Sequence, residues 1–171
     1  NDQSDVARYI TNVTFDYRLP FFKDLRANLN LGYDHARGKG SVIIPGNNAV
    51  AFSFQQDFGG GVNNRYENIR QNSLLEFYLN YKKEMGDHTI DAMAGYSWQR
   101  FYNENNFKNT DAAGTPTQTV ERNGVAEELF LLSTFGRINY GFKDRYLLTV
   151  SGRGDAISRY APENRWGFFP A

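Results

Sequence analysis

The feature that most constrains this chain is a regular alternation of apolar and polar side chains between residues 130 and 155. Successive side chains of a β-strand point to opposite faces, so this alternation predicts strands with one apolar and one polar face. The break Lys143–Asp144–Arg145 divides the stretch into two strands. The apolar set is Phe130, Leu132, Thr134, Gly136, Ile138, Tyr140, Phe142, Tyr146, Leu148 and Val150, and the opposite set is dominated by Ser133, Arg137, Asn139, Gly141, Thr149, Ser151, Arg153 and Asp155.

The same alternation predicts four further strands, and a seventh candidate strand begins at Trp166. Short connections (LPFFKD, KEMGD and KDR) join the strands in pairs, whereas long stretches separate the pairs. The stretch 36–70 is rich in Gly and Asn, and we interpret it as an extended polar loop with a small hairpin near 49–56. The four strands are expected at about 6–18, 25–35, 71–82 and 88–101, and the long connections at about 36–70, 102–128 and 156–165.

Composition restricts the class of protein. The 19 basic and 19 acidic residues give a formal net charge of zero, whereas a nucleic-acid-binding chain normally has a basic surplus. The absence of cysteine excludes disulfides, thiol catalysis and thiolate metal sites. The 14 Phe, 11 Tyr and 2 Trp, together with 16 Gly, indicate an all-β protein. No apolar run approaches the roughly 20 residues of a membrane-spanning helix.

Three features bear on whether the apolar faces contact lipid or a protein core. The expected strands are about 11–14 residues long, closer to the roughly 9–11 of a membrane-spanning strand than to the roughly 5–6 of an ordinary strand. Short turns at one end and long loops at the other are the layout of outer-membrane barrels. Aromatic side chains gather near the strand ends, as in the girdles at the two membrane interfaces. The pattern therefore favours an antiparallel transmembrane β-barrel.

The C-terminal part carries a series of short motifs: STFGRINYGFKDRYLLTVSGRGD is followed by SRYAPENRWGFFPA. These segments resemble the barrel of the SusC/RagA-type TonB-dependent transporters of Bacteroidota outer membranes. The resemblance is close over 129–171, good over 70–100 and loose before that. The matching residues are Phe135, Gly136, Arg137, Asn139, Tyr140, Tyr146, Leu147, Leu148, Arg153, Asp155, Ser158, Arg159, Asn164, Trp166, Gly167, Phe169 and Pro170.

The resemblance implies a multi-pass barrel in a Gram-negative outer membrane with about 22 strands, of which this chain would hold about six or seven. It also implies an N-terminal plug domain and a segment contacted by TonB, neither of which is expected here. Residues 1–171 end in mid-motif and are expected to be part of a single barrel domain. The implied function is import of a nutrient, an oligosaccharide or a peptide, through a barrel surrounded by lipid and capped by a SusD-like lipoprotein. No cofactor is expected.

No catalytic set is found, and His35 and His88 are isolated, so neither an enzyme nor a metal site is expected. Charged residues of the polar face and the outer loop beside it are candidates to line the barrel and contact plug or cargo, although a structural Arg–Asp network is the favoured interpretation. Loop aromatics are candidates to contact cargo or a lid, with packing inside the loops as the alternative. The first set is Arg137, Arg153, Asp155 and Arg159, and the second is Phe52, Phe54, Phe58, Tyr66 and Phe107.

Two other classes of protein stay open at this point. A complete eight-stranded outer-membrane barrel with a structural or adhesion role has about this length. A soluble β-sandwich that binds carbohydrate would also show alternation, but it would have shorter strands.

Overall fold

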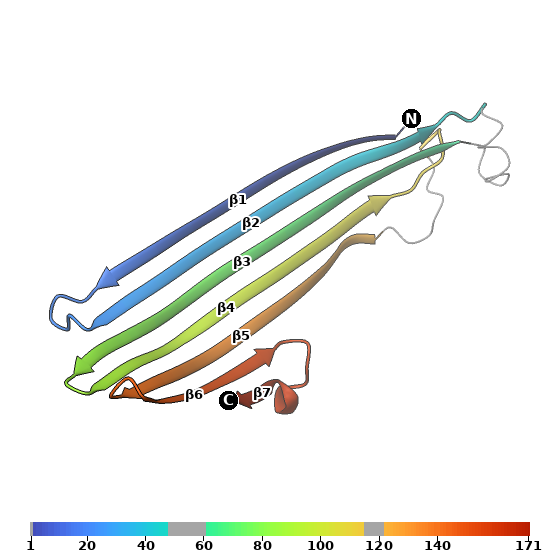
Figure 1. The fold of residues 1–171 in the computed structure, drawn as a ribbon. Helices are drawn as coiled ribbons and strands as arrows, with labels where there is room; N and C mark the ends of the chain where they lie inside the picture. Colours follow the sequence, from blue (N-terminus) through green and yellow to red (C-terminus); the bar gives the residue numbers. More distant parts are fainter. Residues whose placement is uncertain (1, 48–60, 115–121) are drawn as a thin grey trace. The chain divides into compact units, whose positions relative to one another are not determined.

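The computed structural model describes residues 2–47, 61–114 and 122–171, which form seven strands (Figure 1). The strands pair in chain order in one antiparallel sheet, so the described residues do not form a two-sheet sandwich. A short 3-10 helix, Pro162–Asn164, precedes the last strand. The strands are β1 (Asp2–Arg18), β2 (Leu25–Ile44), β3 (Val62–Met85), β4 (His88–Lys108), β5 (Arg122–Phe142), β6 (Tyr146–Ile157) and β7 (Trp166–Pro170).

The strands reach further into the expected long loops than the sequence predicts. The prediction of a loop over 36–70 is wrong at both ends, because β2 continues to Ile44 and β3 begins at Val62. β4 likewise continues to Lys108, and β5 begins at Arg122. Ladder hydrogen bonds join backbone groups, so a strand needs no apolar side chains where neither face meets an apolar surface. The hairpin expected near 49–56 lies outside the described residues.

The connections β3–β4 and β5–β6 are tight turns, and the β1–β2 connection is longer, from Leu19 to Asp24. Gly86, between β3 and β4, has a φ of 60°, a left-handed conformation that glycine adopts without steric cost. Between β5 and β6, Lys143 and Asp144 have φ values of 53° and 52°. Two successive residues with positive φ are the hallmark of the hairpin turn whose twist matches that of the flanking strands.

Hydrogen bonds between backbone groups also link neighbouring turns. The Lys143 N–H, in the β5–β6 turn, donates to the carbonyl of Asp87, in the β3–β4 turn, at 2.7 Å. The N–H of Lys82 donates to the carbonyl of Asp24, in the β1–β2 connection, at 2.9 Å. The β5–β6 turn is therefore joined to the β3–β4 turn, and the β1–β2 connection is joined to strand β3.

The register of β5 and β6 confirms the two expected faces. Ile138 lies opposite Val150 on one face, and Arg137 lies opposite Ser151 on the other. Because side chains alternate along both strands, this register also sets Tyr140 beside Leu148 and Phe142 beside Tyr146 on the apolar face.

The sheet has no interior of its own. No large side chain of the described residues is fully buried, and Leu148 and Val150 are 59% and 54% exposed. A water-soluble protein rarely exposes contiguous apolar surface on this scale. The apolar face must therefore meet an apolar partner outside the described residues. Other exposed apolar side chains include Val13, Phe15, Tyr17, Leu31, Tyr33, Phe77, Ile138, Tyr146, Trp166 and Phe168.

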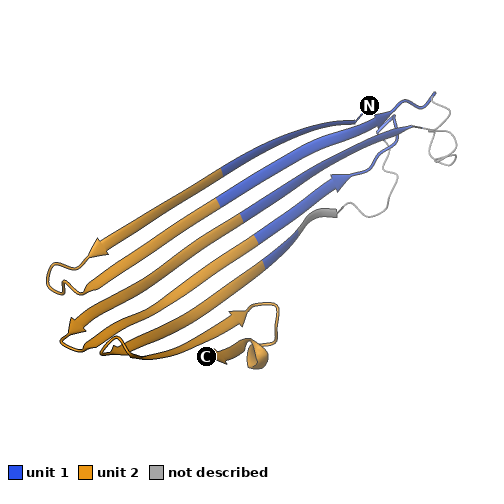
Figure 2. Ribbon diagram, viewed as in Figure 1, with its two compact units in different colours: residues 1–9, 34–71, 102–128 blue, residues 10–33, 72–101, 129–171 orange. Residues whose placement is uncertain are grey.

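Two compact units divide the chain (Figure 2). Unit 1 comprises residues 1–9, 34–71 and 102–128, and unit 2 comprises residues 10–33, 72–101 and 129–171. Each of β1 to β5 contributes residues to both units. The short turns belong to unit 2, together with β6 and β7.

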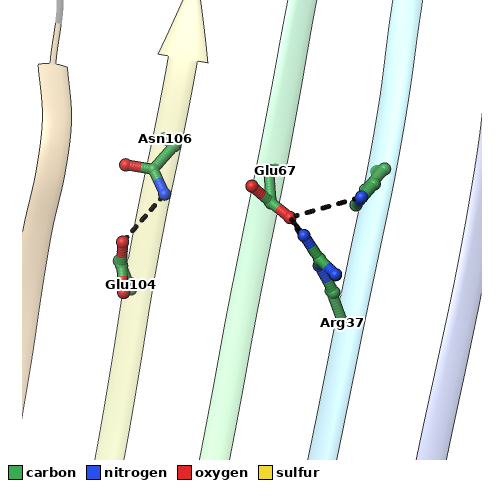
Figure 3. Close-up of polar contacts among 5 residues, drawn as sticks. Arg37, Glu67, Glu104 and Asn106 are labelled. Carbon is green, nitrogen blue, oxygen red and sulfur yellow. Dashed lines mark hydrogen bonds and ion pairs between the residues drawn. The ribbon is translucent and has the colours of Figure 1, made fainter.

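Within unit 1, polar side chains pair along and between strands (Figure 3). Arg37 and Lys39 of β2 both reach the carboxylate of Glu67 on β3, with the Lys39 Nζ at 3.8 Å. On β4 the Glu104 carboxylate accepts a hydrogen bond of 2.9 Å from the amide of Asn106. Exposed ion pairs of this kind contribute roughly 0–1 kcal/mol each, so they define strand register more than they stabilise the sheet.

Replacing Gly95 by alanine should destabilise unit 2. The added Cβ would lie 2.6 Å from the Tyr78 Cβ and 2.7 Å from the Phe135 Cζ, so the ring that covers this glycine must move. Such overpacking costs about 1–3 kcal/mol. The check is the temperature at which the full-length protein in detergent loses its compact mobility on a gel.

Gly136 provides the matched control for this substitution. A Cβ there would meet its nearest heavy atom, the Met93 carbonyl oxygen, at an ordinary 3.6 Å. Gly136→Ala should therefore leave the transition temperature unchanged. Equal effects of the two substitutions would show that the ring of Phe135 does not limit the space at Gly95.

Candidate functional site on the polar face

A hollow of about 600 Å³ opens on unit 2, and its lining comes from five neighbouring strands, β3 to β7. We call it the Arg137 hollow. It combines carboxylate, amide, hydroxyl and guanidinium groups with two phenyl rings. The lining residues are Glu76, Met93, Ser97, Gln99, Leu131, Ser133, Phe135, Gly136, Arg137, Ser151, Gly152, Arg153 and Phe169.

Arg153 is held in place by two neighbours. Its Nε donates to the Asp155 carboxylate at 2.8 and 3.0 Å, and its Nη2 donates to the Ser133 hydroxyl at 3.1 Å. Ser133 lies directly opposite Asp155 in the β5–β6 register and is only 7% exposed. The arrangement satisfies a buried hydroxyl and orients the guanidinium by two independent contacts. The contact joins Arg153 and Asp155, two of the four residues for which the sequence predicts an Arg–Asp network.

Arg137 lies on the same face but is chemically different from Arg153. Its position in β5 faces Ser151 of β6, and its side chain is exposed. It forms no ion pair or hydrogen bond with any residue in the described ranges. Its guanidinium, with five N–H donors in a fixed planar fork, is therefore available to a group that enters the hollow.

A chain of hydrogen bonds leads away from the hollow across three strands. The amide of Asn30 on β2 donates to the carboxylate of Glu76 on β3 at 3.1 Å. Asn30 in turn accepts a hydrogen bond of 3.2 Å from the hydroxyl of Thr14 on β1. These residues occupy the polar set of their strands, so the polar face continues across unit 2 as a bonded surface.

The other predicted site residues are dispersed. Arg159 is exposed, lies beyond the end of β6 after Ser158, and does not line the hollow. Tyr66 and Phe107 lie within β3 and β4, which corrects their expected placement in loops. Tyr66 packs against Gly40 of the neighbouring strand, where an added Cβ would have no room. Phe52, Phe54 and Phe58 fall outside the described residues.

Sequence reasoning missed several residues that line the hollow. Phe135 lies on the same face of β5 as Ser133 and Arg137. An aromatic residue at a position of the polar set was the sequence signal that could have identified it. Phe169 lies opposite Arg153 in the β6–β7 register and has the same signal. Glu76 and Gln99 come from strands distant in sequence, and only the pairing of the sheet brings them to the hollow.

The chemistry of the hollow is suited to binding. Among the described residues there is no group of three or more His, Cys, Asp or Glu that could hold a metal ion. A free guanidinium, serine hydroxyls and a glutamine amide can form hydrogen bonds with a polar guest, while the phenyl rings offer flat apolar surface. None of the described helical residues forms a helix long and apolar enough to span a membrane.

Known proteins resemble this chain in sequence. It is 31% identical to the TonB-dependent receptor SusC of Bacteroides thetaiotaomicron over 100% of this chain and 17% of SusC. It is 32% identical to the TonB-dependent receptor P3 of Formosa agariphila over 66% of this chain and 12% of that protein. The chain thus spans less than a fifth of the length of these relatives. No protein-family model matches.

The fold also has counterparts among solved structures. The structure of the RagAB peptide transporter matches with a TM-score of 0.82, over 99% of this chain and 19% of that one, at 19% sequence identity. The RagAB peptide importer in its closed-closed state matches with a TM-score of 0.74 and 18% identity. The likeness confirms the expected fold, a segment of antiparallel barrel sheet. Sequence and fold together identify the chain as a barrel segment of the SusC-like TonB-dependent receptors.

Proposed function

We propose that residues 1–171 form part of the wall of a single barrel domain in an outer-membrane transporter, whose plug domain lies elsewhere in the polypeptide. The observation that carries this proposal is the sheet without an interior, with one exposed apolar face and one bonded polar face. The apolar face then contacts lipid and the polar face lines the lumen, as in outer-membrane barrels.

The change of chemistry along β2 supports this orientation. Leu31 and Tyr33 continue, at every second position, into Arg37 and Lys39 on the same side of the strand. A charged side chain on the lipid side raises the free energy of the folded barrel strongly within the hydrocarbon layer and only slightly near its edge. The hydrocarbon layer therefore ends between Tyr33 and Arg37 on this strand, and the remainder of β2 projects beyond it.

The cargo is a nutrient that the transporter imports, an oligosaccharide or a peptide. The names of the relatives support coupling to TonB, and the RagAB structure, described as a peptide transporter, supports a peptide cargo. The SusD-like lipoprotein that caps the barrel is proposed from the family resemblance. The Arg137 hollow supports either cargo, since its donors, acceptors and rings suit both sugar hydroxyls and peptide groups.

The two arginines have separate roles in this proposal. Arg153 and Asp155 maintain the polar face, and Arg137 contacts plug or cargo. Arg159 remains a predicted contact for plug or cargo. The predicted contacts for cargo or lid remain Tyr66, Phe107, Phe52, Phe54 and Phe58.

The proposal is tested on the native polypeptide, purified in detergent from its own membrane. We expect an intact mass several times the 19.6 kDa of this chain and a co-purifying lipoprotein. We also expect that deleting the gene, or depleting TonB, abolishes uptake of the same oligosaccharide or peptide. A native mass near 19.6 kDa would favour the small eight-stranded barrel instead.

Val150→Lys should reduce insertion of the full-length protein into the outer membrane. A lysine on the lipid face costs about 2–4 kcal/mol near the middle of the membrane. Thr149→Lys, one residue away on the polar face, is the control and should insert normally. The measurement is the folded fraction in purified outer membranes, judged by gel mobility without heating, and equal insertion would contradict the assignment of the faces.

Arg153→Ala and Arg137→Ala should affect different properties. Loss of Arg153 breaks its contacts with Asp155 and Ser133 and should lower the free energy of unfolding by up to about 1 kcal/mol, because the pair is partly exposed to water. Loss of Arg137 should leave stability unchanged and slow cargo uptake. Thermal unfolding and uptake rates of the two variants check this, and the reverse outcome would exchange the two roles.

A further inference from the structure

A second hollow, of about 540 Å³, lies at the end of unit 2 that carries the short turns. We call it the basic hollow, because its lining holds five cationic side chains against two carboxylates. Neither the alternation nor the family resemblance assigns it a role. The lining residues are Arg18, Lys23, Asp24, Arg26, Asn80, Lys82, Lys83 and Glu84.

The backbone around the basic hollow is well ordered by hydrogen bonds. In the β1–β2 connection, the Leu19 N–H donates to the Leu25 carbonyl at 3.1 Å, and the Phe22 N–H donates back to Leu19 at 3.2 Å. The Lys82 N–H bonds this connection to β3 through Asp24 at 2.9 Å. The cations are therefore kept close together by the fold, although their side chains extend into water.

The carboxylates present do not balance the cations. Three of the five cationic side chains have a carboxylate within ion-pair distance, one of which, Asp16, lies outside the lining. Arg18 and Lys23 form no ion pair with any residue in the described part of the chain. The pairs are Lys83–Asp24 at 3.4 Å, Lys82–Glu84 at 4.0 Å and Arg26–Asp16 at 3.1 Å.

This local surplus of positive charge attracts anions. The side of the sheet on which the basic hollow opens restricts the kind of anion that can reach it. Arg18 and Arg26 share the polar alternation of their strands, opposite the apolar Tyr17 and Leu25, so the hollow does not face hydrocarbon. Its volume is many times the roughly 30 Å³ of one water molecule, which is far more than a single phosphate or carboxylate fills.

We propose that the basic hollow binds an acidic peptide segment, whose carboxylates pair with Arg18, Lys23 and Lys82. Lysine and arginine pair with carboxylates through charge-assisted hydrogen bonds, and the gain is largest where cations lack partners, as Arg18 and Lys23 do. This proposal rests on the proposed function in one respect, which is that the polar face of the sheet is in contact with water. It does not depend on which cargo is carried.

The test uses the full-length protein in detergent, treated with a water-soluble carbodiimide that joins amines to carboxylates in direct contact. Hexaglutamate is the added probe, and mass spectrometry locates the new amide bonds. We expect bonds from Lys23 or Lys82 to hexaglutamate, or to an acidic segment outside residues 1–171 that already fills the hollow. Lys23→Gln with Lys82→Gln should lower the hexaglutamate yield by about tenfold or more.

Lys143→Gln is the matched control, since Lys143 lies in the β5–β6 turn outside the basic hollow. Its yield should equal that of the unchanged protein. Folding of each variant is verified by gel mobility, and protection of Lys23 from acetylation by hexaglutamate provides a readout that needs no variant. Failure of cargo uptake would count against the proposed transport function and leave these readouts unaffected.

Two results would overturn the proposal. One is cross-linking confined to Asp24 and Glu84, which already lie in the lining, without protection of Lys23. The other is equal protection of Lys23 by inorganic phosphate and by hexaglutamate at the same concentration, which would make the hollow a site for small anions.

Discussion

A sheet without an interior obtains the free energy of folding from its surroundings, and most features of this chain follow from that constraint. The seven strands pair with one another through backbone hydrogen bonds within the plane of the sheet, which leaves each row of side chains to match whatever medium lies beside it. On one side this is a polar surface that bonds to itself, from Thr14 through Asn30 to Glu76. On the other side exposed residues such as Val150 bury nothing within the described chain. A chain of this design acquires its stability only when the apolar side is covered.

Alternation was sufficient to predict the architecture because side-chain direction in a strand is a local property. The faces of β5 and β6, the three short turns and the strand at Trp166 could all be read from residues close in sequence. The ends of β2 and β3 could not, since the stretch from Arg37 to Ser41 holds only charged residues, glycines and a serine and so resembles a loop. What continues the strand there is backbone pairing with a neighbour, reinforced by contacts such as Glu67 with Arg37. No local pattern encodes such pairing.

The candidate site likewise has features that the local sequence predicts and features that depend on strand pairing. The pairing of Arg153 with Asp155 is predictable from their spacing on one face, and the structure adds the buried hydroxyl of Ser133, which comes from the neighbouring strand. The different state of Arg137 was not predictable, because the absence of a partner depends on every residue that the sheet brings near it. In the sequence, both arginines belong to the polar set of an alternating strand. Only the register distinguishes a side chain that maintains the surface from one that is free to meet a guest.

The hydrogen bonds between neighbouring turns have a mechanical consequence. The bond from Lys143 to Asp87 and the bond from Lys82 to Asp24 connect hairpins that would otherwise be joined only through their strands. A load on one hairpin is thereby shared with the next, so these hairpin ends are harder to displace separately than hairpins without such bonds. Loss of one of the two hydrogen bonds would allow the hairpins on either side of it to move apart while the strand pairing stays intact.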